Sequence, residues 1–157
     1  MGCTPRSQTA KSNQPGTSNP TVLNSFWTNI WKLNIPKNVK HFLWRACSDS
    51  LPTKRNLAQR RIITNVTCDL CRDQPEDAIH TLWDCYGVKE IWWKEEVCKP
   101  FLIERFMNFQ DLFLGILKAH DPHLAERFAF IAWRIWYKRN AVRTGFPSLP
   151  YSMIHTE

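Results

Sequence analysis

Four residues with the spacing of metal ligands stand in the middle of the chain. Cys68 and Cys71 are separated by two residues, His80 follows after eight more, and Cys85 after a further four. Two thiolates in a C-x2-C turn can converge on one ion, and a second pair about ten residues on can complete a tetrahedron. We therefore predict that Cys68, Cys71, His80 and Cys85 bind one Zn²⁺.

This ligand set favours a structural site over a catalytic one. Four protein ligands fill the coordination shell of zinc, whereas a catalytic zinc keeps one position for water. Three thiolates around a divalent cation leave a negative charge, which Arg60, Arg61 and Arg72 can offset. The alternative is coincidence, in which the cysteines are small buried hydrophobic residues and His80 is an ordinary surface residue.

The other cysteines are Cys3, Cys47 and Cys98. The N-terminus has no apolar signal-peptide core, so we expect an intracellular location, the nucleus included, where disulfides are disfavoured. Cys47 lies beside an apolar helical face and is expected in the core. Gly2-Cys3 is similar to the start of acylated proteins, but the acylation motif needs Ser or Thr where Arg6 stands.

Composition allows one compact domain. Hydrophobic residues make up 43% and aromatic residues 13% of the 157 residues, which is enough for a core. Charges interrupt every apolar run before the ~18 residues of a membrane span, so no membrane association is expected. The chain has only five glycines and no glycine-rich phosphate loop. No arrangement of Ser, His and Asp indicates an enzyme.

Positive charge is concentrated in one segment. The net charge is +7, and eight basic residues but one acidic residue lie between Lys32 and Arg61. The rest of the chain is balanced, so this segment carries the whole excess. Such a distribution favours a polyanionic partner, although it is also compatible with a solvated face.

Four segments are expected along the chain. Residues 1–25 are rich in Ser, Thr, Asn, Gly and Pro and contain no aromatic residue, which predicts a disordered tail. Residues 26–98 hold the basic segment and the ligand motif. Residues 99–143 form an aromatic-rich helical extension, and 144–157 a flexible C-terminus. The fold class is mainly α, a small helical domain organised around a structural zinc site.

The first half of this domain shows three helical patterns. Apolar spacing predicts a short helix over 26–33. Pro36 suits the first position of a second helix, whose apolar face includes Phe42 and Leu43. Trp44 is expected on the core side. Thr53 is a good N-cap for a third, basic helix.

The sequence of the second half predicts three more helices. A short helix is expected between Glu76 and Asp84, and another through the apolar repeat from Leu102 to Ile116. Asp121 caps a last helix with Pro122 at its first position. This helix is apolar on much of its circumference, so we expect other elements or a partner to surround it.

The combined pattern resembles a known family. The residues that carry the resemblance are Trp31, Pro36, Lys37, Lys40, Phe42, Leu43, Trp44, Leu51-Pro52-Thr53, Asn56-Leu57, Arg60, Cys68, Cys71, Pro75-Glu76, His80 and Cys85. Together they resemble the zinc-binding domain of reverse transcriptases, abundant in plant non-LTR (LINE-like) retrotransposons. Trp133-x-x-Trp136-x-x-Arg139-Asn140 is similar to the segment that often follows this domain ahead of ribonuclease H. The resemblance covers about residues 26–143.

The resemblance implies an accessory module of a retroelement polymerase. It carries Cys68, Cys71, His80 and Cys85 over as metal ligands and assigns no catalytic residue. Neither a Tyr/Phe-x-Asp-Asp stretch nor a ribonuclease H set of acidic residues occurs in the sequence. We therefore expect a fragment without polymerase or nuclease activity, whose partners include the polymerase or ribonuclease H domain of a parent element.

Two functions remain open. A nucleic-acid-binding module would contact RNA or DNA phosphates through basic side chains. The candidates are Lys37, Lys40, Arg45, Lys54, Arg55, Arg60 and Arg61. Alternatively, a structural module would dock onto a polymerase or another chain through apolar faces of the last two helices. The stripe on those helices also suits an internal core.

Overall fold

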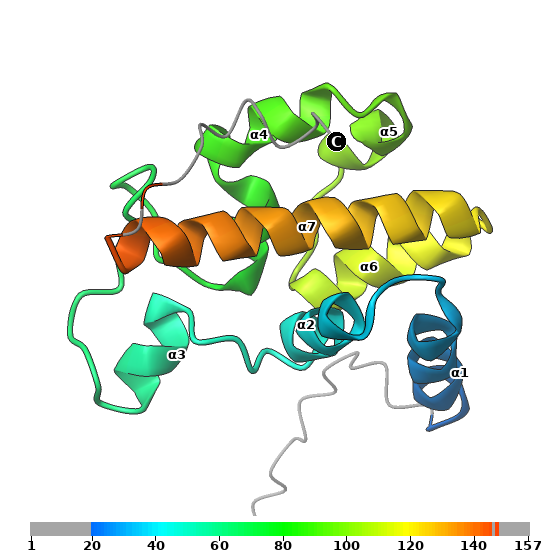
Figure 1. Ribbon diagram of the computed structural model, residues 1–157, viewed down its shortest axis with the longest axis horizontal. Coiled ribbons are helices and arrows are strands. Elements are labelled where there is room, and N and C mark those ends of the chain that lie inside the picture. Colours follow the sequence, from blue (N-terminus) through cyan, green and yellow to red (C-terminus); the bar gives the residue numbers. More distant parts are fainter. Residues whose placement is uncertain (1–19, 146, 148–157) are drawn as a thin grey trace, which may run out of the picture.

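The structure is a computed structural model that describes residues 20–145 and residue 147 (Figure 1). Helices account for most of this range, and the only β-type pairing among these residues is an isolated bridge between Thr67 and Pro75. The helices are α1 (Pro20–Lys32), α2 (Lys37–Cys47), α3 (Lys54–Gln59), the π-helix η1 (His80–Asp84), α4 (Tyr86–Trp93), the 3₁₀ helix η2 (Glu96–Cys98), α5 (Lys99–Leu102), α6 (Phe109–Lys118) and α7 (Pro122–Arg143). The fold is thus mainly α, as the sequence predicts.

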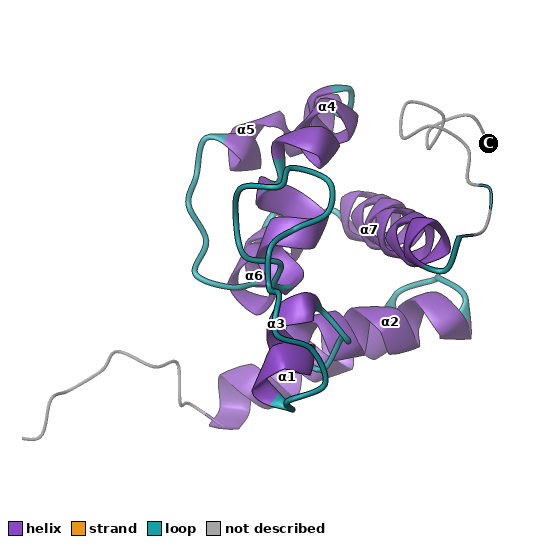
Figure 2. Cartoon of the chain, turned by 90° about the vertical axis from the view of Figure 1, so that its left-hand side faces the viewer, coloured by secondary structure: helices purple, strands orange, loops and turns teal. Residues whose placement is uncertain are grey.

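Helix α7 is the central element. It crosses the molecule with α2 beneath it and α4 above it in both views (Figures 1 and 2). It packs against α2, α6 and η1, which brings the start and the end of the chain into one core. No helix in the part of the chain that the structure describes has the length and apolarity to cross a bilayer.

An aromatic cluster fills the centre of the core. The ring of Phe128 in α7 stacks on Trp92 with centroids 4.7 Å apart, and its centroid lies 5.8 Å from that of Trp83. Phe109 and Phe113 of α6 contact Phe128 from another side. Burial of such rings contributes more apolar area than any aliphatic residue, so this cluster holds α4, α6 and α7 together.

Side-chain caps fix the starts of two helices that the sequence predicts. Thr53 Oγ1 accepts a hydrogen bond from the Asn56 amide at 3.2 Å. Asp121 Oδ1 accepts from the amides of His123 and Leu124, with Pro122 at the first position of α7. Both caps confirm the sequence prediction. Each satisfies backbone donors that the first helical turn leaves without a partner.

Two predicted boundaries at the start of the chain are wrong. Helix α1 begins at Pro20 rather than Phe26, so residues 20–25 of the expected tail are helical. Burial of Phe26 and Ile30 anchors this helix against α2, and tertiary packing overrides the polar composition of its first turns. Pro36 is the N-cap of α2 and not its first residue. Residues 1–19, 146 and 148–157 lie outside the described range.

The helix expected from Leu102 to Ile116 is two helices. Helix α5 ends at Leu102, and α6 starts at Phe109. Asn108 Oδ1 accepts from the Asp111 amide at 2.9 Å, so this side chain provides a new N-cap and a new start. The half-buried Phe106 still packs on the core from the intervening loop. The apolar periodicity therefore reports burial here and not a continuous helix.

Candidate metal centre

The cysteine hairpin, residues 66–76, presents Cys68 and Cys71 from a tight loop. The Cys68 amide donates to the Gln74 carbonyl at 2.9 Å, and the Glu76 amide to the Val66 carbonyl at 2.8 Å. The Arg72 amide donates to the Cys68 carbonyl, and Arg72 adopts a positive φ of 57°. These bonds turn the chain back after Cys71, so both thiols lie on one side of the loop.

The π-helix η1 presents the other two ligands. In an α-helix, the side chains of residues five apart point about 140° away from each other and cannot bind the same metal ion. Here the Cys85 amide donates to the His80 carbonyl at 2.9 Å, the i→i+5 bond of a π turn. This wider turn brings His80 and Cys85 to the same side. Single π turns are rare and occur frequently at functional sites.

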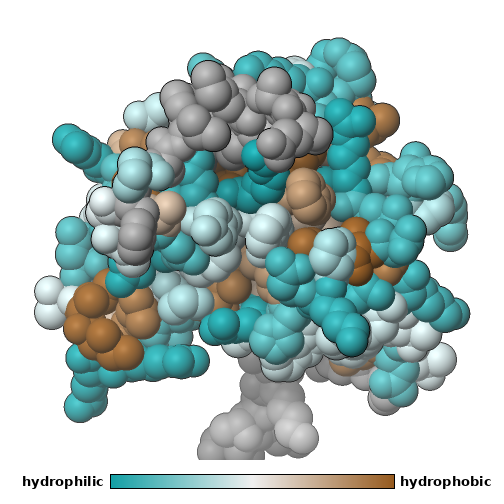
Figure 3. Space-filling model, in the orientation of Figure 1, coloured by the Kyte–Doolittle hydropathy of each residue, from teal (hydrophilic) through white to brown (hydrophobic). Residues whose placement is uncertain are grey.

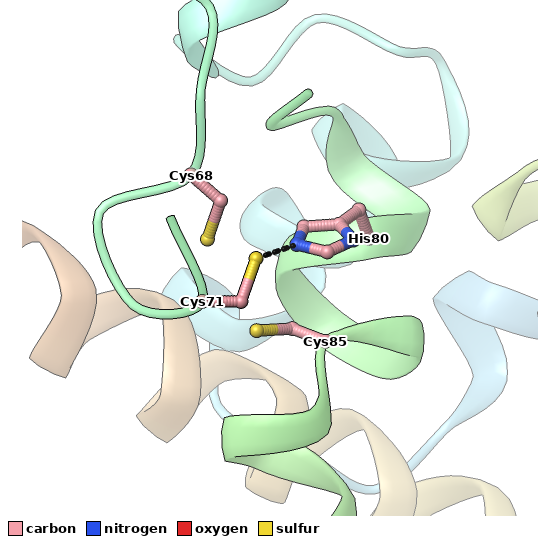
Figure 4. A group of neighbouring side chains, drawn as sticks. All are labelled: Cys68, Cys71, His80 and Cys85. Atoms are coloured by element: carbon pink, nitrogen blue, oxygen red, sulfur yellow. Dashed lines mark hydrogen bonds between the residues drawn. The ribbon is translucent and has the colours of Figure 1, made fainter. Parts of the chain in front are cut away.

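The four ligand atoms converge on one point (Figure 4). The three Sγ atoms and one imidazole nitrogen all lie within 4.8 Å of one another. Cys71 Sγ and His80 Nε2 are 3.3 Å apart. A tetrahedron with Zn–S bonds of about 2.3 Å places two sulfurs about 3.8 Å apart, so a small contraction closes the shell. Cys68, His80 and Cys85 are buried and Cys71 is half-buried.

The ligand side chains shift one another's pKa values because they share protons. A hydrogen bond from Cys85 lowers the pKa of Cys68 to about 3, and the same bond, together with burial, raises the pKa of Cys85 far above its usual range. Burial opposes the charged form of His80, but the thiolates of Cys68 and Cys71 outweigh it and raise the His80 pKa to about 8. Zn²⁺ takes the place of these protons.

Neighbouring side chains hold the two ligand pairs in register. Lys54 Nζ donates to the Thr67 carbonyl at 2.8 Å and to Asp69 Oδ1, which ties α3 to the cysteine hairpin. Asp77 Oδ1 accepts from the His80 amide at 2.9 Å, and its other oxygen pairs with Arg55 Nη1 at 2.8 Å. This outer layer orients the ligands before any metal binds.

A close approach between the hairpin and α4 requires a glycine. A Cβ added at Gly87 would lie 2.6 Å from Leu70 Cδ2 and 2.7 Å from its Cγ, so any side chain there displaces Leu70. Leu70 stands between the two hairpin cysteines, and Gly87 comes two residues after Cys85. The glycine thus lets the hairpin close over the start of α4.

The sequence did not predict an ion pair behind the site. Glu76 ends the hairpin and is 2% exposed, and Arg139 of α7 is 9% exposed. Arg139 Nε lies 3.3 Å from Glu76 Oε2, and Nη2 pairs with Oε1. Glu76 Oε1 also accepts from the Lys54 amide at 3.0 Å. Both residues belong to the quoted family pattern, which is the only sequence signal for this contact.

Six of the seven basic residues predicted to bind phosphate lie in two groups, and the seventh is an exception. Lys37, Lys40 and Arg45 lie on α2, whereas Arg55, Arg60 and Arg61 lie on or just after α3, which is apart from α2 in Figure 1. The exception is Lys54, which is 8% exposed and bonded within the hairpin. Lys54 is a structural residue, so its assignment to phosphate binding is wrong.

The predicted basic residues also differ in how far they reach into solvent. Lys37, Arg60, Arg61 and Arg72 are exposed. The three arginines therefore lie in solvent, which screens their effect on the charge of the metal cluster. Lys40 Nζ donates to the Trp31 carbonyl and Arg45 Nη2 to the Ser50 carbonyl, each at 2.9 Å.

The aromatic residues of α2 separate into buried and exposed sides. Phe42, Leu43 and Cys47 are buried, as the sequence predicts. Trp44 is 39% exposed and contacts His41, so its expected place in the core is wrong. Helical rotation places Trp44 beside the exposed His41 rather than beside Leu43.

Comparison with known proteins agrees with this geometry. Residues 10–92 match the family model described as zinc-binding in reverse transcriptase, which is more than half of the chain. A curated Arabidopsis thaliana protein named for ribonuclease H is 31% identical over 68 residues. That region is 43% of this chain but 11% of the relative, so the chain spans a small part of the protein it matches. No solved structure matches the chain. The matched residues include all four converging ligands, and the chain belongs to the zinc-binding domain family of reverse transcriptases.

Proposed function

We propose that this chain is a nucleic-acid-binding module whose fold is held by a structural zinc ion and which has no catalytic group of its own. The observation that carries the proposal is the placement of the basic segment. The whole net charge of +7 lies between Lys32 and Arg61, immediately before the zinc hairpin. Lys37, Arg60 and Arg61 extend into solvent from this segment.

The zinc site explains why such a segment can be presented by a small domain. Lys54 and Arg55 of α3 bond to the cysteine hairpin and to Asp77, so the zinc site is joined to the helix that directly precedes Arg60 and Arg61. Basic side chains on a rigid element lose less entropy when they contact phosphates. The closed ligand set supports structural rather than hydrolytic chemistry for the metal.

Salt dependence of binding tests the proposal. The zinc-loaded chain is titrated into a fluorescein-labelled DNA duplex and into a matched RNA at increasing KCl, with anisotropy as the readout. About six phosphate contacts predict a slope near −5 in the logarithm of the association constant on duplex DNA. The Arg60→Gln/Arg61→Gln variant should reduce the magnitude of this slope by about two.

A matched variant controls for net charge. Lys94 and Lys118 are exposed basic residues outside the basic segment. Lys94→Gln/Lys118→Gln removes the same charge and should leave the slope nearly unchanged. A flat salt response, or equal effects of the two double variants, would overturn the proposal.

The partners and location follow from the same proposal. The matched relative carries a ribonuclease H name, and the family is that of reverse transcriptases. We propose that the module acts beside a polymerase or ribonuclease H domain on the nucleic acid that such enzymes copy, in the nucleus. Co-purification with a separately expressed polymerase domain, in the presence and absence of nuclease, distinguishes direct docking from contact through nucleic acid.

A further inference from the structure

An aromatic ladder, Phe130, Trp133 and Tyr137, runs along the outer face of α7. The ring centroids of Phe130 and Trp133 are 5.7 Å apart, and those of Trp133 and Tyr137 are 5.9 Å apart. Spacings of three and four residues place all three on one side of the helix. Tyr137 is 66% exposed, Phe130 is exposed and Trp133 is half-buried. The ladder therefore offers ring surface to solvent.

The charge of α7 along the ladder is mainly positive, and Glu126, four residues before Phe130, is the nearest acidic residue of the helix. From residue 127 to residue 143, α7 contains five basic residues and no acidic residue. Arg127 pairs with Glu95, and Arg139 with Glu76. Arg134 is half-buried and Arg143 is exposed. A negatively charged partner thus suits this face better than a basic or neutral one does.

The surface over α7 is also not a continuous apolar patch. Figure 3 shows this side of the molecule, where small hydrophobic areas are interrupted by hydrophilic residues and residues of intermediate hydropathy. A protein interface of useful size has an apolar centre with few charges. A short row of aromatic rings with an arginine beside it is instead typical of surfaces on which bases stack.

The ladder lies on the same side of the core as the start of α2. The Asn34 amide, just before α2, donates to Glu126 Oε1 of α7 at 2.7 Å. Helix α2 passes beneath α7 in both views (Figures 1 and 2), and the exposed Lys37 is its first residue, three residues after Asn34. A strand held by α2 has a short path to the rings.

We propose that the aromatic ladder is a stacking platform for the bases of single-stranded nucleic acid, with Arg134 beside its phosphates. This rests on the proposed nucleic-acid-binding function and names the form of ligand. Bases of a duplex are already stacked on one another, whereas bases of a single strand can stack on Trp133 and Tyr137 without regard to sequence. Trp136, three residues after Trp133, is buried against Arg139 and serves the fold instead.

Single-residue variants of the full zinc-loaded chain test the platform. Fluorescein-labelled oligo(dT) and a duplex of the same length are titrated in parallel. Trp133→Ala and Tyr137→Ala should each weaken oligo(dT) binding by about tenfold and leave duplex binding nearly unchanged. Tyr86→Ala is the matched control, because Tyr86 is 67% exposed on α4 and lies outside the ladder. Tyr137→Phe keeps a ring and should bind as the unaltered chain does.

Each result decides for or against the platform. Circular dichroism and zinc content confirm that a variant is folded, and if Trp133→Ala is not folded, Trp133→Phe should instead lose part of the tryptophan quenching caused by oligo(dT). Unchanged oligo(dT) binding by Tyr137→Ala overturns the platform, while a loss in Arg60→Gln/Arg61→Gln keeps the proposed function. If the unaltered chain binds neither probe, both fail. If the ladder variants lose only binding to a polymerase domain, the ladder is a protein-docking face and the platform is refuted.

Discussion

Arg139 and Glu76 form a buried ion pair that joins the last helix to the cysteine hairpin across 63 residues of sequence. The guanidinium also lies 4.7 Å from the centroid of the Trp136 ring. Because Glu76 accepts from the Lys54 amide as well, one carboxylate connects the hairpin, α3 and α7. The zinc site and α7 are therefore directly connected through Glu76.

Loss of one partner of this pair should be strongly destabilising. In Arg139→Met the Glu76 carboxylate remains buried without its cation, which costs about 3–5 kcal/mol of the free energy of unfolding. Glu76→Gln/Arg139→Met removes both charges and keeps an oxygen for the Lys54 amide, so it should recover most of that loss. Urea unfolding followed by circular dichroism measures both. Equal destabilisation of the single and double variants would show that the charge pairing is unimportant.

Substitution of a zinc-binding cysteine should have a much larger effect than substitution of Cys98, a buried cysteine outside the site. Cys68→Ser, Cys71→Ser and Cys85→Ser should each lower the zinc content toward zero and cost several kcal/mol, since metal binding and folding are coupled. Cys98→Ala is the control, because Cys98 is buried but lies outside the ligand cluster. It should retain one zinc per chain by metal analysis. Normal zinc in any of the three serine variants would remove that residue from the site.

Local patterns predicted most helices and the ligand set. Thr53 and Asp121 were recognisable because a cap acts within three residues of sequence. The C-x2-C, His and Cys spacing was recognisable because a metal restricts residue type and distance together. These are short-range constraints, and they can be read without knowledge of the tertiary structure.

Features that depend on long-range packing could not be read. The π turn at His80 has no side-chain signature, and the apolar repeat through Phe106 continues where the helix does not. Lys54 looked like a phosphate ligand until its bonds to Thr67 and Asp69 placed it in the hairpin. The side of α2 that Trp44 occupies depends on where α7 packs.

Zinc affinity should fall as the solution is acidified. At pH 7 the metal-free cluster holds a proton on His80, whose pKa is raised to about 8, and another on Cys85, whose pKa is raised further. Zinc must expel both, so binding should release at least these two protons. Calorimetric titration in buffers of different ionisation enthalpy measures this number. Zinc binding with no proton release would contradict the shared-proton arrangement.

The stability of the metal-free chain should depend only weakly on pH between about 6.5 and 8. The pKa of His80 is higher in the folded chain than the ~6.5 of an unfolded chain, so its pairing with thiolate stabilises the fold fully below about 6.5. That contribution is lost as pH rises through about 8. Over the same range Cys68, a thiolate in the folded chain and a thiol in the unfolded chain, contributes stability that rises with pH. Thermal unfolding of the chelator-treated chain between these values should therefore show a nearly constant midpoint, and a steep change in either direction would contradict this balance.

After zinc removal, the cysteines of the metal cluster should be alkylated faster than the cysteines of the core. Burial raises the pKa of Cys47, and burial together with Glu95 raises that of Cys98 to about 12. Thiolate is the reactive form, so both should resist iodoacetamide at neutral pH, with or without zinc. Chelation should expose Cys68, whose pKa is lowered, and the half-buried Cys71 to rapid alkylation. Peptide mass mapping over time gives each rate. If Cys98 reacts as fast as Cys71 after chelation, metal loss unfolds the whole core and not the cysteine hairpin alone.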